Sequence, residues 1–317
     1  MTDLQPLPSA DGILAAYKAI DPLFLDTPLV RHAAADAELG FALHAKVETL
    51  NPIRAFKGRG TDWLLQTMSA DGGTPLVTAS AGNFGQGLAH AAAKRGRQAI
   101  IFAAANANPL KVAAMRGLGA EVLLHGKDFD AAKTEARRFA EAKGYAFVED
   151  GAEPAIAEGA GTIALEITRQ AEMRGIALDA ILVPLGNGAL LTGVGTWIKA
   201  KMPSCRVIGI VAAEAPAMLL SWRRGGLVTT PSASTIADGI AVREPVPYAL
   251  ETMKGTVDDV WTVGEETIRS AMRFCRQHYG LVVEPAGAAG VAAALEYRGK
   301  LAGQSVATIL CGGNAHP

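Results

Sequence analysis

The chain has 317 residues, of which 50% are hydrophobic and 19% are charged. This composition supplies a large core and excludes an intrinsically disordered protein, because disorder requires low hydrophobicity and high net charge. Thirty Lys and Arg residues balance 31 Asp and Glu residues to a net charge of −1, so no chain-wide basic field exists that would favour nucleic acid as a partner.

Short apolar runs alternate with alanine-rich helical patterns along the chain. The runs predict strands at 75–78, 98–102, 121–124, 180–184, 206–211 and 305–310. The helical patterns cover 61–68, 86–95, 109–118, 129–143, 162–174 and 193–201. This alternation predicts an α/β protein with mostly parallel sheets, and continuous apolar strands are typical of sheets covered by helices on both faces. Acidic, Gly and Pro residues at 148–159 indicate a domain boundary there.

The cysteines and the longest uncharged run bear on the compartment. Cys205, Cys275 and Cys311 are widely spaced and predict neither a disulfide framework nor a zinc site. They fit a reducing compartment, and the first residues predict no signal peptide, so we expect a cytoplasmic protein. The run 181–198 is long enough to suggest a membrane span. Pro184 and Gly193 are among the residues that interrupt it, so we expect a strand, a loop and a helix there, and no membrane partner.

Three glycine-rich loops follow predicted strands, where ligands bind in parallel α/β folds. The loop at 78–87 opens a helix whose first amides would favour an anion, although a simple turn between strand and helix also needs glycine. The loop at 184–190 is a candidate phosphate cradle. It fits a nicotinamide nucleotide poorly, because Leu191 occupies the third glycine position and no acidic residue follows about 20 residues on. The third loop is Cys311 to Asn314.

Lys57 stands in a distinctive local context. It lies between Phe56 and Gly58, directly before a predicted helix. The dipole at the start of a helix disfavours a cation, and burial would favour the neutral amine further. The alternative is a solvated surface lysine.

Taken together, these segments resemble the fold-type II pyridoxal-phosphate (PLP) enzymes, in particular the group of threonine/serine dehydratases and serine racemases. The resemblance covers nearly the whole chain, and its motifs follow one another at 26–29, 56–60, 80–83, 159–166, 235–242, 282–288 and 311–314. It implies two three-layer αβα domains similar to tryptophan synthase β, with PLP in the cleft between them. Residues 1–50 and 150–317 would form the larger PLP-binding domain, and 51–149 a smaller mobile domain with the carboxylate-binding loop. A homodimer is the family expectation. Because the sequence stops at Pro317, we expect neither the C-terminal regulatory domain of biosynthetic threonine deaminases nor feedback control by isoleucine.

The resemblance also implies a role for each site residue. Lys57 would form the Schiff base with PLP and remove the α-proton of the substrate, and Ser80 would be the second catalytic residue. Cys311 would donate its thiol to the pyridine nitrogen, which favours loss of a β-leaving group over a long-lived carbanion. The cofactor would contact Phe56, Lys57, Asn83, Gly186, Asn187, Gly188, Ala189, Leu190, Gly239, Glu284 and Cys311. The substrate carboxylate would lie on Ser80, Ala81, Gly82, Asn83 and Phe84.

Several positions depart from the pattern of the group. Ala81 stands where racemases carry a serine that acts on the opposite face, so we expect little racemisation. Val211 stands where racemases hold a divalent cation, and the six histidines show no metal spacing, so we expect no metal. Phe84 replaces a usual histidine, which weakens the case for an acidic substrate. Arg54 is expected to be a solvated loop residue, and Glu153, like Glu284, would either approach the site or cap a helix.

The expected activity is PLP-dependent β-elimination from a small β-hydroxy amino acid such as L-threonine or L-serine, giving a 2-oxo acid and ammonia. The alternatives within PLP chemistry are a β-replacement synthase, an amino-acid racemase, and a lyase for 3-hydroxyaspartate or diaminopropionate. A catalytically silent binding protein is opposed by the intact Lys57. A nicotinamide oxidoreductase is opposed by Leu191.

Overall fold

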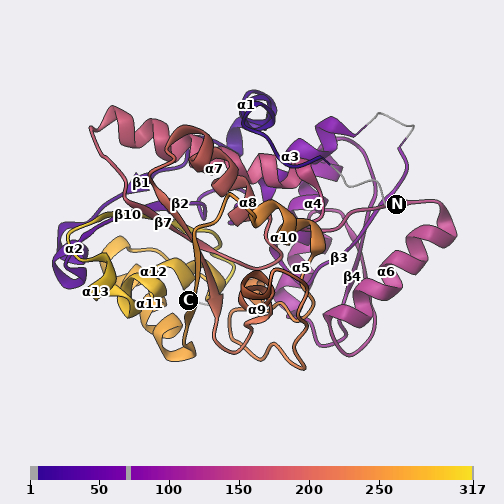
Figure 1. Ribbon diagram of the computed structural model, residues 1–317. Coiled ribbons are helices and arrows are strands. Elements are labelled where there is room, and N and C mark those ends of the chain that lie inside the picture. The colour runs from indigo at the N-terminus through magenta and orange to yellow at the C-terminus, as the bar shows by residue number, and fades with distance from the viewer. Residues whose placement is uncertain (1–5, 69–72, 316–317) are drawn as a thin grey trace.

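Two separate sheets organise the computed structural model, which describes residues 6–68 and 73–315. One sheet has the strand order β1-β2-β10-β7-β8-β9 and the other β5-β4-β3-β6 (Figure 1). The strands are β1 Leu29–Val30, β2 Ala42–Val47, β3 Leu76–Ala79, β4 Ala99–Ala103, β5 Glu121–Leu124, β6 Ala146–Phe147, β7 Ala180–Pro184, β8 Arg206–Ala212, β9 Asp259–Val263 and β10 Ser305–Leu310. Every strand pair within these sheets is parallel except β1 with β2. The expected mostly parallel α/β fold is confirmed, and each predicted strand lies within one residue of its position.

Helices connect the strands and cover both sheets. The α-helices are α1 Ala10–Ala19, α2 Ala33–Leu39, α3 Lys57–Thr67, α4 Asn83–Lys94, α5 Pro109–Gly117, α6 Phe129–Lys143, α7 Pro154–Met173, α8 Ala189–Lys201, α9 Ala217–Arg224, α10 Pro247–Met253, α11 Glu265–Tyr279, α12 Ala289–Glu296 and α13 Arg298–Leu301. Short 3-10 helices lie at η1 Pro22–Phe24, η2 Asp238–Ile240 and η3 Ala286–Ala288. The run 181–198 forms β7, a loop and the first part of α8, as expected, and no helix of the described residues could span a membrane.

Four helices begin earlier than the sequence predicts. These are α3, α4, α7 and α8, which start at Lys57, Asn83, Pro154 and Ala189 rather than at 61, 86, 162 and 193. Glycine lowers helix propensity, and each predicted start was placed beyond a glycine-containing stretch. Gly193 shows why glycine occurs inside these helices: a Cβ atom there would lie 1.9 Å from the carbonyl oxygen of Ala157. Glycine therefore allows α7 and α8 to pack closely.

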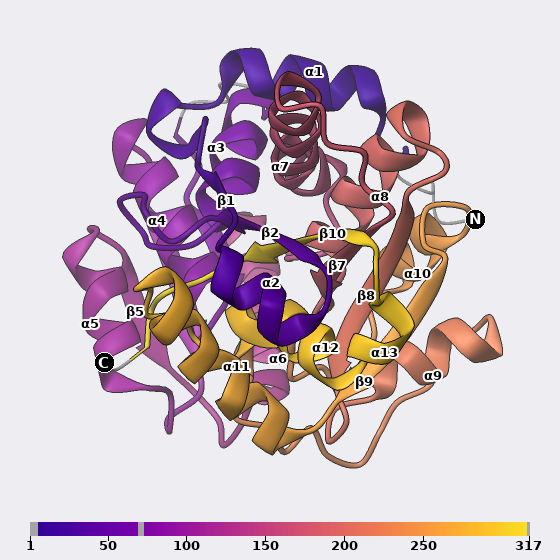
Figure 2. The same ribbon diagram turned by 90° about the vertical axis from the view of Figure 1, so that its left-hand side faces the viewer.

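Alternating side chains of the six-stranded sheet face two different helical layers. Ile181 and Val183 of β7 belong to one buried cluster with residues of α7 and α8, including Ile163 and Leu191. Leu182, between them, belongs to a second cluster with residues of α11 and α12. Figures 1 and 2 show the sheet between these two helical layers. Such a sheet needs apolar residues on both faces, which explains the continuous apolar runs.

The four-stranded sheet is built in the same way. Leu76 and Ile101 pack with residues of α4 and α5, whereas Val77 and Ile100 pack with α6. This sheet lies entirely within residues 76–147, inside the segment 51–149 that we propose as the smaller domain. Helix α3 packs against both α4 and α7, so Lys57 begins a helix at the junction of the two sheets.

Candidate active site

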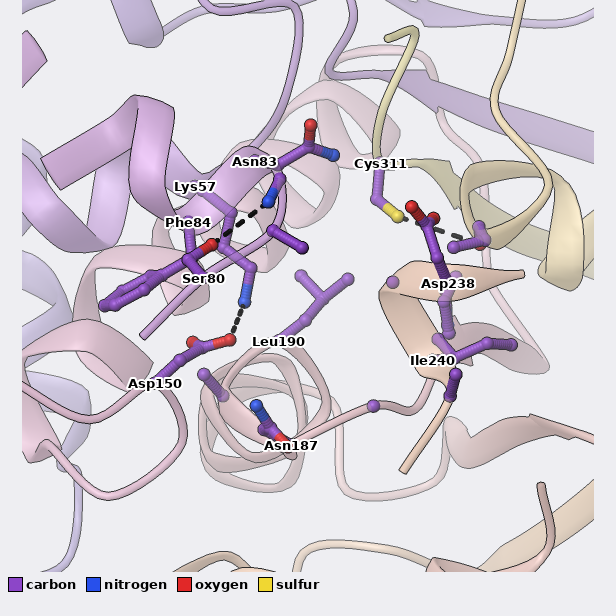
Figure 3. A pocket seen from close by; sticks show the side chains of 18 of the residues that line it. Lys57, Ser80, Asn83, Phe84, Asp150, Asn187, Leu190, Asp238, Ile240 and Cys311 are labelled. Carbon is purple, nitrogen blue, oxygen red and sulfur yellow. Dashed lines mark hydrogen bonds and ion pairs between the residues drawn. The ribbon is translucent and has the colours of Figure 1, made fainter. Parts of the chain in front are cut away.

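A cavity of about 310 Å³ lies between the two sheets. Such a volume is at the lower end of the range for small-molecule sites, ~300–1,000 Å³. The cavity adjoins the carboxyl ends of β3, β7 and β10, where this fold class binds ligands (Figure 3). Its lining includes every residue that the resemblance assigns to catalysis, to the cofactor and to the substrate carboxylate, namely Phe56, Lys57, Ser80, Ala81, Gly82, Asn83, Phe84, Gly186, Asn187, Gly188, Ala189, Leu190, Gly239, Glu284 and Cys311. Residues far apart in the chain thus meet at one site, while their individual roles remain predictions.

The backbone before Lys57 is held in place by one buried amide side chain. The Oδ1 atom of Asn51 accepts hydrogen bonds from the N–H groups of Ile53 and Ala55, each at 3.2 Å. The N–H group of Phe56 donates to the carbonyl oxygen of Cys311 at 3.1 Å. These contacts fix the lysine segment against the end of β10, so Lys57 begins α3 with its amine in the cavity.

Four buried charged side chains that pair with one another hold α3 in place beyond Lys57. The Arg59 side chain is fully buried, with Nε 2.8 Å from Oε2 of Glu48 and Nη1 2.6 Å from Oε1 of Glu166. The Nζ atom of Lys46 lies 2.6 Å from Oε2 of Glu166. Two cations therefore match two carboxylates, and the group joins α3 to β2 and α7.

The amine of Lys57 has a carboxylate partner that the sequence analysis missed. Its Nζ atom lies 2.6 Å from Oδ2 of Asp150, and the two side chains are 16% and 14% exposed (Figure 3). The rings of Phe56 and Phe84 lie beside the amine, with centroids 4.7 and 5.6 Å from Nζ. The alternative of a solvated surface lysine is therefore wrong. Asp150 follows β6, so the rule that ligands bind at the carboxyl ends of strands could have indicated it.

Ser80 organises the loop that leads into α4. Its Oγ atom accepts hydrogen bonds from the N–H groups of Gly82 and Gly85, at 3.2 and 2.9 Å. The hydroxyl hydrogen remains available to donate into the cavity. The loop ends at Asn83, the first residue of α4, where the dipole of the helix favours an anion. The loop therefore suits a carboxylate.

Asn83 is held on both sides of its amide. Its Nδ2 atom donates to Oε1 of Glu284 at 2.5 Å, and its Oδ1 atom accepts from Nδ2 of Asn314 at 2.8 Å. Burial raises the pKa of Glu284 to about 7, although Lys111 acts in the opposite direction. The Oε2 atom of Glu284 is buried and has no hydrogen-bond partner among the described residues.

Two further charged residues line the cavity without having been predicted. Lys111 of α5 forms an ion pair with Asp238 of η2, which joins the two walls. They lie 127 positions apart, so no local pattern links them. Asp238 does belong to the motif at 235–242 that carries part of the resemblance.

The loop at 186–190 has the geometry of a phosphate cradle. Gly188 has a φ of +101°, a left-handed backbone conformation that residues with a side chain rarely adopt. Helix α8 begins at the next residue. The first amides of a helix have no partners within that helix and lie at the positive end of its dipole. This loop therefore suits a phosphate group held by backbone amides.

Cys311 lies directly after β10 and is buried. Its Sγ atom donates to the carbonyl oxygen of Ala286 at 3.9 Å. Burial raises the pKa of the Cys311 thiol far above its usual value, so the group stays neutral. A neutral thiol can donate a hydrogen bond to a pyridine nitrogen but cannot keep that nitrogen protonated.

These features together fit PLP: an amine in the cavity, a phosphate cradle, an amide and a neutral thiol. Two other candidates lie elsewhere. Arg54 is exposed and does not line the cavity. Glu153 occupies the N-cap position of α7, makes no capping hydrogen bond, and is also outside the lining. In the described part of the chain, no group of three or more potential metal ligands occurs.

The fold and the site define a PLP-dependent enzyme, and the comparison with known families agrees. A family model described as pyridoxal-phosphate dependent enzyme matches residues 20–312, so the chain belongs to this family and uses PLP. An L-threonine ammonia-lyase from Thermotoga maritima is 34% identical over 305 residues, which are 96% of this chain and 75% of that protein. An L-threonine ammonia-lyase from Geobacter sulfurreducens is 37% identical over 91% of this chain and 71% of its own length.

Solved structures show the same similarity in three dimensions. A threonine deaminase crystal structure superposes with a TM-score of 0.92 at 32% identity, covering 98% of this chain and 99% of that one. Maize serine racemase superposes with a TM-score of 0.90 at 29% identity, covering 98% and 95%. These neighbours support the expected pair of αβα domains.

Proposed function

We propose that the protein is a PLP-dependent ammonia-lyase that converts a small β-hydroxy amino acid such as L-threonine or L-serine into a 2-oxo acid and ammonia by β-elimination. The observation that carries this proposal is the Lys57 amine in a cavity bordered by an anion-binding loop and a phosphate cradle. Relatives named L-threonine ammonia-lyase support the same reaction class.

When bound, PLP supplies an aldehyde that joins covalently to an amine and a ring that accepts electrons from the substrate Cα. The amides of 186–190 would hold its phosphate, Asn83 its ring oxygen and Cys311 its ring nitrogen. The neutral thiol of Cys311 leaves that nitrogen unprotonated, so the ring is a modest electron acceptor. This favours prompt departure of a β-substituent.

The protein's own groups orient the substrate and move its protons. The amides of 80–84 and the Ser80 hydroxyl bind the α-carboxylate, which turns the Cα–H bond toward Lys57. Lys57 takes the α-proton and returns a proton to the β-hydroxyl, which leaves as water. Hydrolysis of the resulting enamine gives the 2-oxo acid and ammonia, so one water is released and one is consumed.

The finer assignments are part of the same proposal. We infer a cytoplasmic homodimer in which residues 51–149 move as the smaller domain. The free, buried cysteines of the described chain support a reducing compartment. Sedimentation of the purified protein tests the dimer.

The test of the reaction is release of 2-oxo acid by PLP-loaded protein from a panel of L- and D-amino acids. The panel contains threonine, serine, 3-hydroxyaspartate and 2,3-diaminopropionate. Release from L-threonine or L-serine is the expected result. Absence of release from every member of the panel would reject this assignment and would point to β-replacement or to a substrate outside the panel. Suppression of release by an added thiol that becomes incorporated into product would indicate β-replacement.

A further inference from the structure

Asp150 has an unusual environment that the proposed mechanism does not use. Its Oδ2 atom pairs with Nζ of Lys57 at 2.6 Å. Its Oδ1 atom is buried and has no hydrogen-bond partner among the described residues. Asp150 nevertheless lines the cavity and its side chain keeps 14% exposure, so the carboxylate can be reached from the cavity.

The position of Asp150 is fixed by the neighbouring backbone. Gly151 follows it with a φ of +86°, and a Cβ atom there would lie 2.3 Å from the carbonyl oxygen of Asn187. The connection from β6 to α7 is thus pressed against the phosphate cradle. Figure 3 shows Asp150 directed toward Lys57, on the side of the cavity that holds Asn187.

Asp150 differs from the other carboxylates of the cavity in the partner that it depends on. Asp238 pairs with Lys111, and Glu284 accepts from Asn83, so neither depends on the reacting amine. Asp150 depends on Lys57, whose amine is consumed when it bonds covalently to the cofactor. A largely buried carboxylate without a donor is costly, so Asp150 lacks a donor when a substrate enters and until that substrate releases the Lys57 amine from the cofactor.

We propose that Asp150 selects the substrate through its side chain, by accepting a hydrogen bond from a hydroxyl or ammonium group there and disfavouring a side-chain carboxylate. This inference rests on the proposed function and names its substrate class: amino acids whose β-substituent carries hydrogen-bond donors. Phe84 offers no cation to an acidic side chain, and Lys111 is already paired.

The test measures equilibrium binding to PLP-loaded protein, followed by the absorbance of the cofactor, with ligands that lack a β-leaving group. L-2,4-diaminobutyrate carries donors, L-aspartate carries a carboxylate, and L-2-aminobutyrate is the neutral reference. We expect the wild type to prefer diaminobutyrate over aspartate. Asp150→Asn should reduce this preference by about tenfold or more, because asparagine can still accept a hydrogen bond but loses the charge that strengthens it. Binding of 2-aminobutyrate should change little.

Glu149→Gln is the matched control. Glu149 is the preceding residue, and it pairs with Lys133 at 3.3 Å and Arg137 at 2.7 Å rather than lining the main cavity. The Glu149→Gln variant should prefer diaminobutyrate over aspartate as strongly as the wild type does. Asp150→Ser should reproduce the effect of Asp150→Asn, which guards against a folding defect in one variant.

An unchanged preference in both Asp150 variants would overturn the inference, leaving Asp150 as a mere counter-ion of Lys57. An equal loss of preference in Glu149→Gln would also overturn it, because the effect would then reflect overall charge. The release of oxo acid by the wild type is independent of these ratios. Its failure with the ligand preference intact would reject the proposed function alone.

Discussion

The Nη1 atom of Arg59 lies 2.6 Å from Oε1 of Glu166, and neither side chain is more than 2% exposed. The pair joins α3, which begins with Lys57, to the long helix α7. Removing one partner of a buried ion pair is strongly destabilising, because the other charge is left without compensation in a medium that solvates it poorly. The ion pair therefore holds the helix of the reactive lysine against the six-stranded part of the molecule.

Glu166→Gln should lower the free energy of unfolding by about 3–5 kcal/mol at neutral pH. The variant leaves Arg59 and Lys46 with Glu48 as the remaining buried carboxylate of the group. Urea unfolding of wild type and variant measures the difference. Glu251→Gln, which removes an exposed pair with Lys254, should cost ~0–1 kcal/mol.

The difference in unfolding free energy between wild type and Glu166→Gln should depend on pH. Burial alone would raise the pKa of Glu166, but Arg59 and Lys46 outweigh it and hold the pKa below its usual value. A lowered pKa in the folded state stabilises the protein above the unfolded pKa, ~4.3, and this stabilisation is lost as the pH falls below it. The gap between wild type and Glu166→Gln should therefore narrow toward pH 3. A constant gap would show that the ion pair is not its cause.

Lys57→Ala should abolish covalent attachment of the cofactor and lower turnover by at least ~10²–10⁴-fold, the range for loss of a positioned acid–base group. Lys57 is partly exposed at the first position of α3, and alanine is a good helix former, so the fold should persist. Borohydride reduction followed by mass spectrometry measures attachment, and a thermal melt checks folding. A reducible adduct or undiminished turnover in a folded variant would reject the assignment of Lys57.

The sequence could locate most of the site because its main parts are local. Lys57 and the loops at 80–84 and 186–190 each lie at a junction with a helix, and glycines mark these junctions. Asp150 was missed because β6, which precedes it, spans only two half-buried residues within the short apolar run 145–148, and no strand was predicted there. Its partner lies 93 positions away, and no local period reports such a pairing. The early starts of α7 and α8 were missed because glycines required for close helix packing also resemble loop signals.

Glu284→Gln should raise the free energy of unfolding of the cofactor-free protein relative to the wild type. This gain should be larger at pH 8 than at pH 5. Burial raises the pKa of Glu284 to about 7, whereas an unfolded glutamate titrates at ~4.3. The folded state therefore binds the extra proton between these values, and its stability falls as the pH rises through this window. Glutamine carries no charge, so the difference between variant and wild type should grow by roughly 3 kcal/mol across the window.

Urea unfolding at pH 5, 6, 7 and 8 measures this difference for Glu284→Gln. The amide oxygen of glutamine can still accept from Nδ2 of Asn83, so the comparison isolates the buried charge. A difference that stays constant with pH would mean that Glu284 is ionised throughout and that Lys111 compensates it fully.

Ala81→Ser should raise racemisation and exchange of the α-proton relative to elimination by about tenfold or more, since a positioned acid–base group contributes ~10²–10⁴-fold. Ala81 lines the cavity between Ser80 and Gly82, and the resemblance described above implies a serine at this position in the racemases of the group. A hydroxyl at this position would supply a proton to the face of Cα opposite Lys57. Proton NMR in D₂O and chiral chromatography measure exchange and racemisation, and 2-oxo acid release measures elimination.

Ala241→Ser provides the matched control, because Ala241 lines the same cavity from the segment after η2 and the substitution adds the same atom. Its ratio of exchange to elimination should equal that of the wild type. A rise in Ala81→Ser alone would show that the missing hydroxyl commits the wild-type site to elimination, because the carbanion then has no donor on its second face. An unchanged ratio in Ala81→Ser would mean that another group supplies that proton or that elimination outruns it.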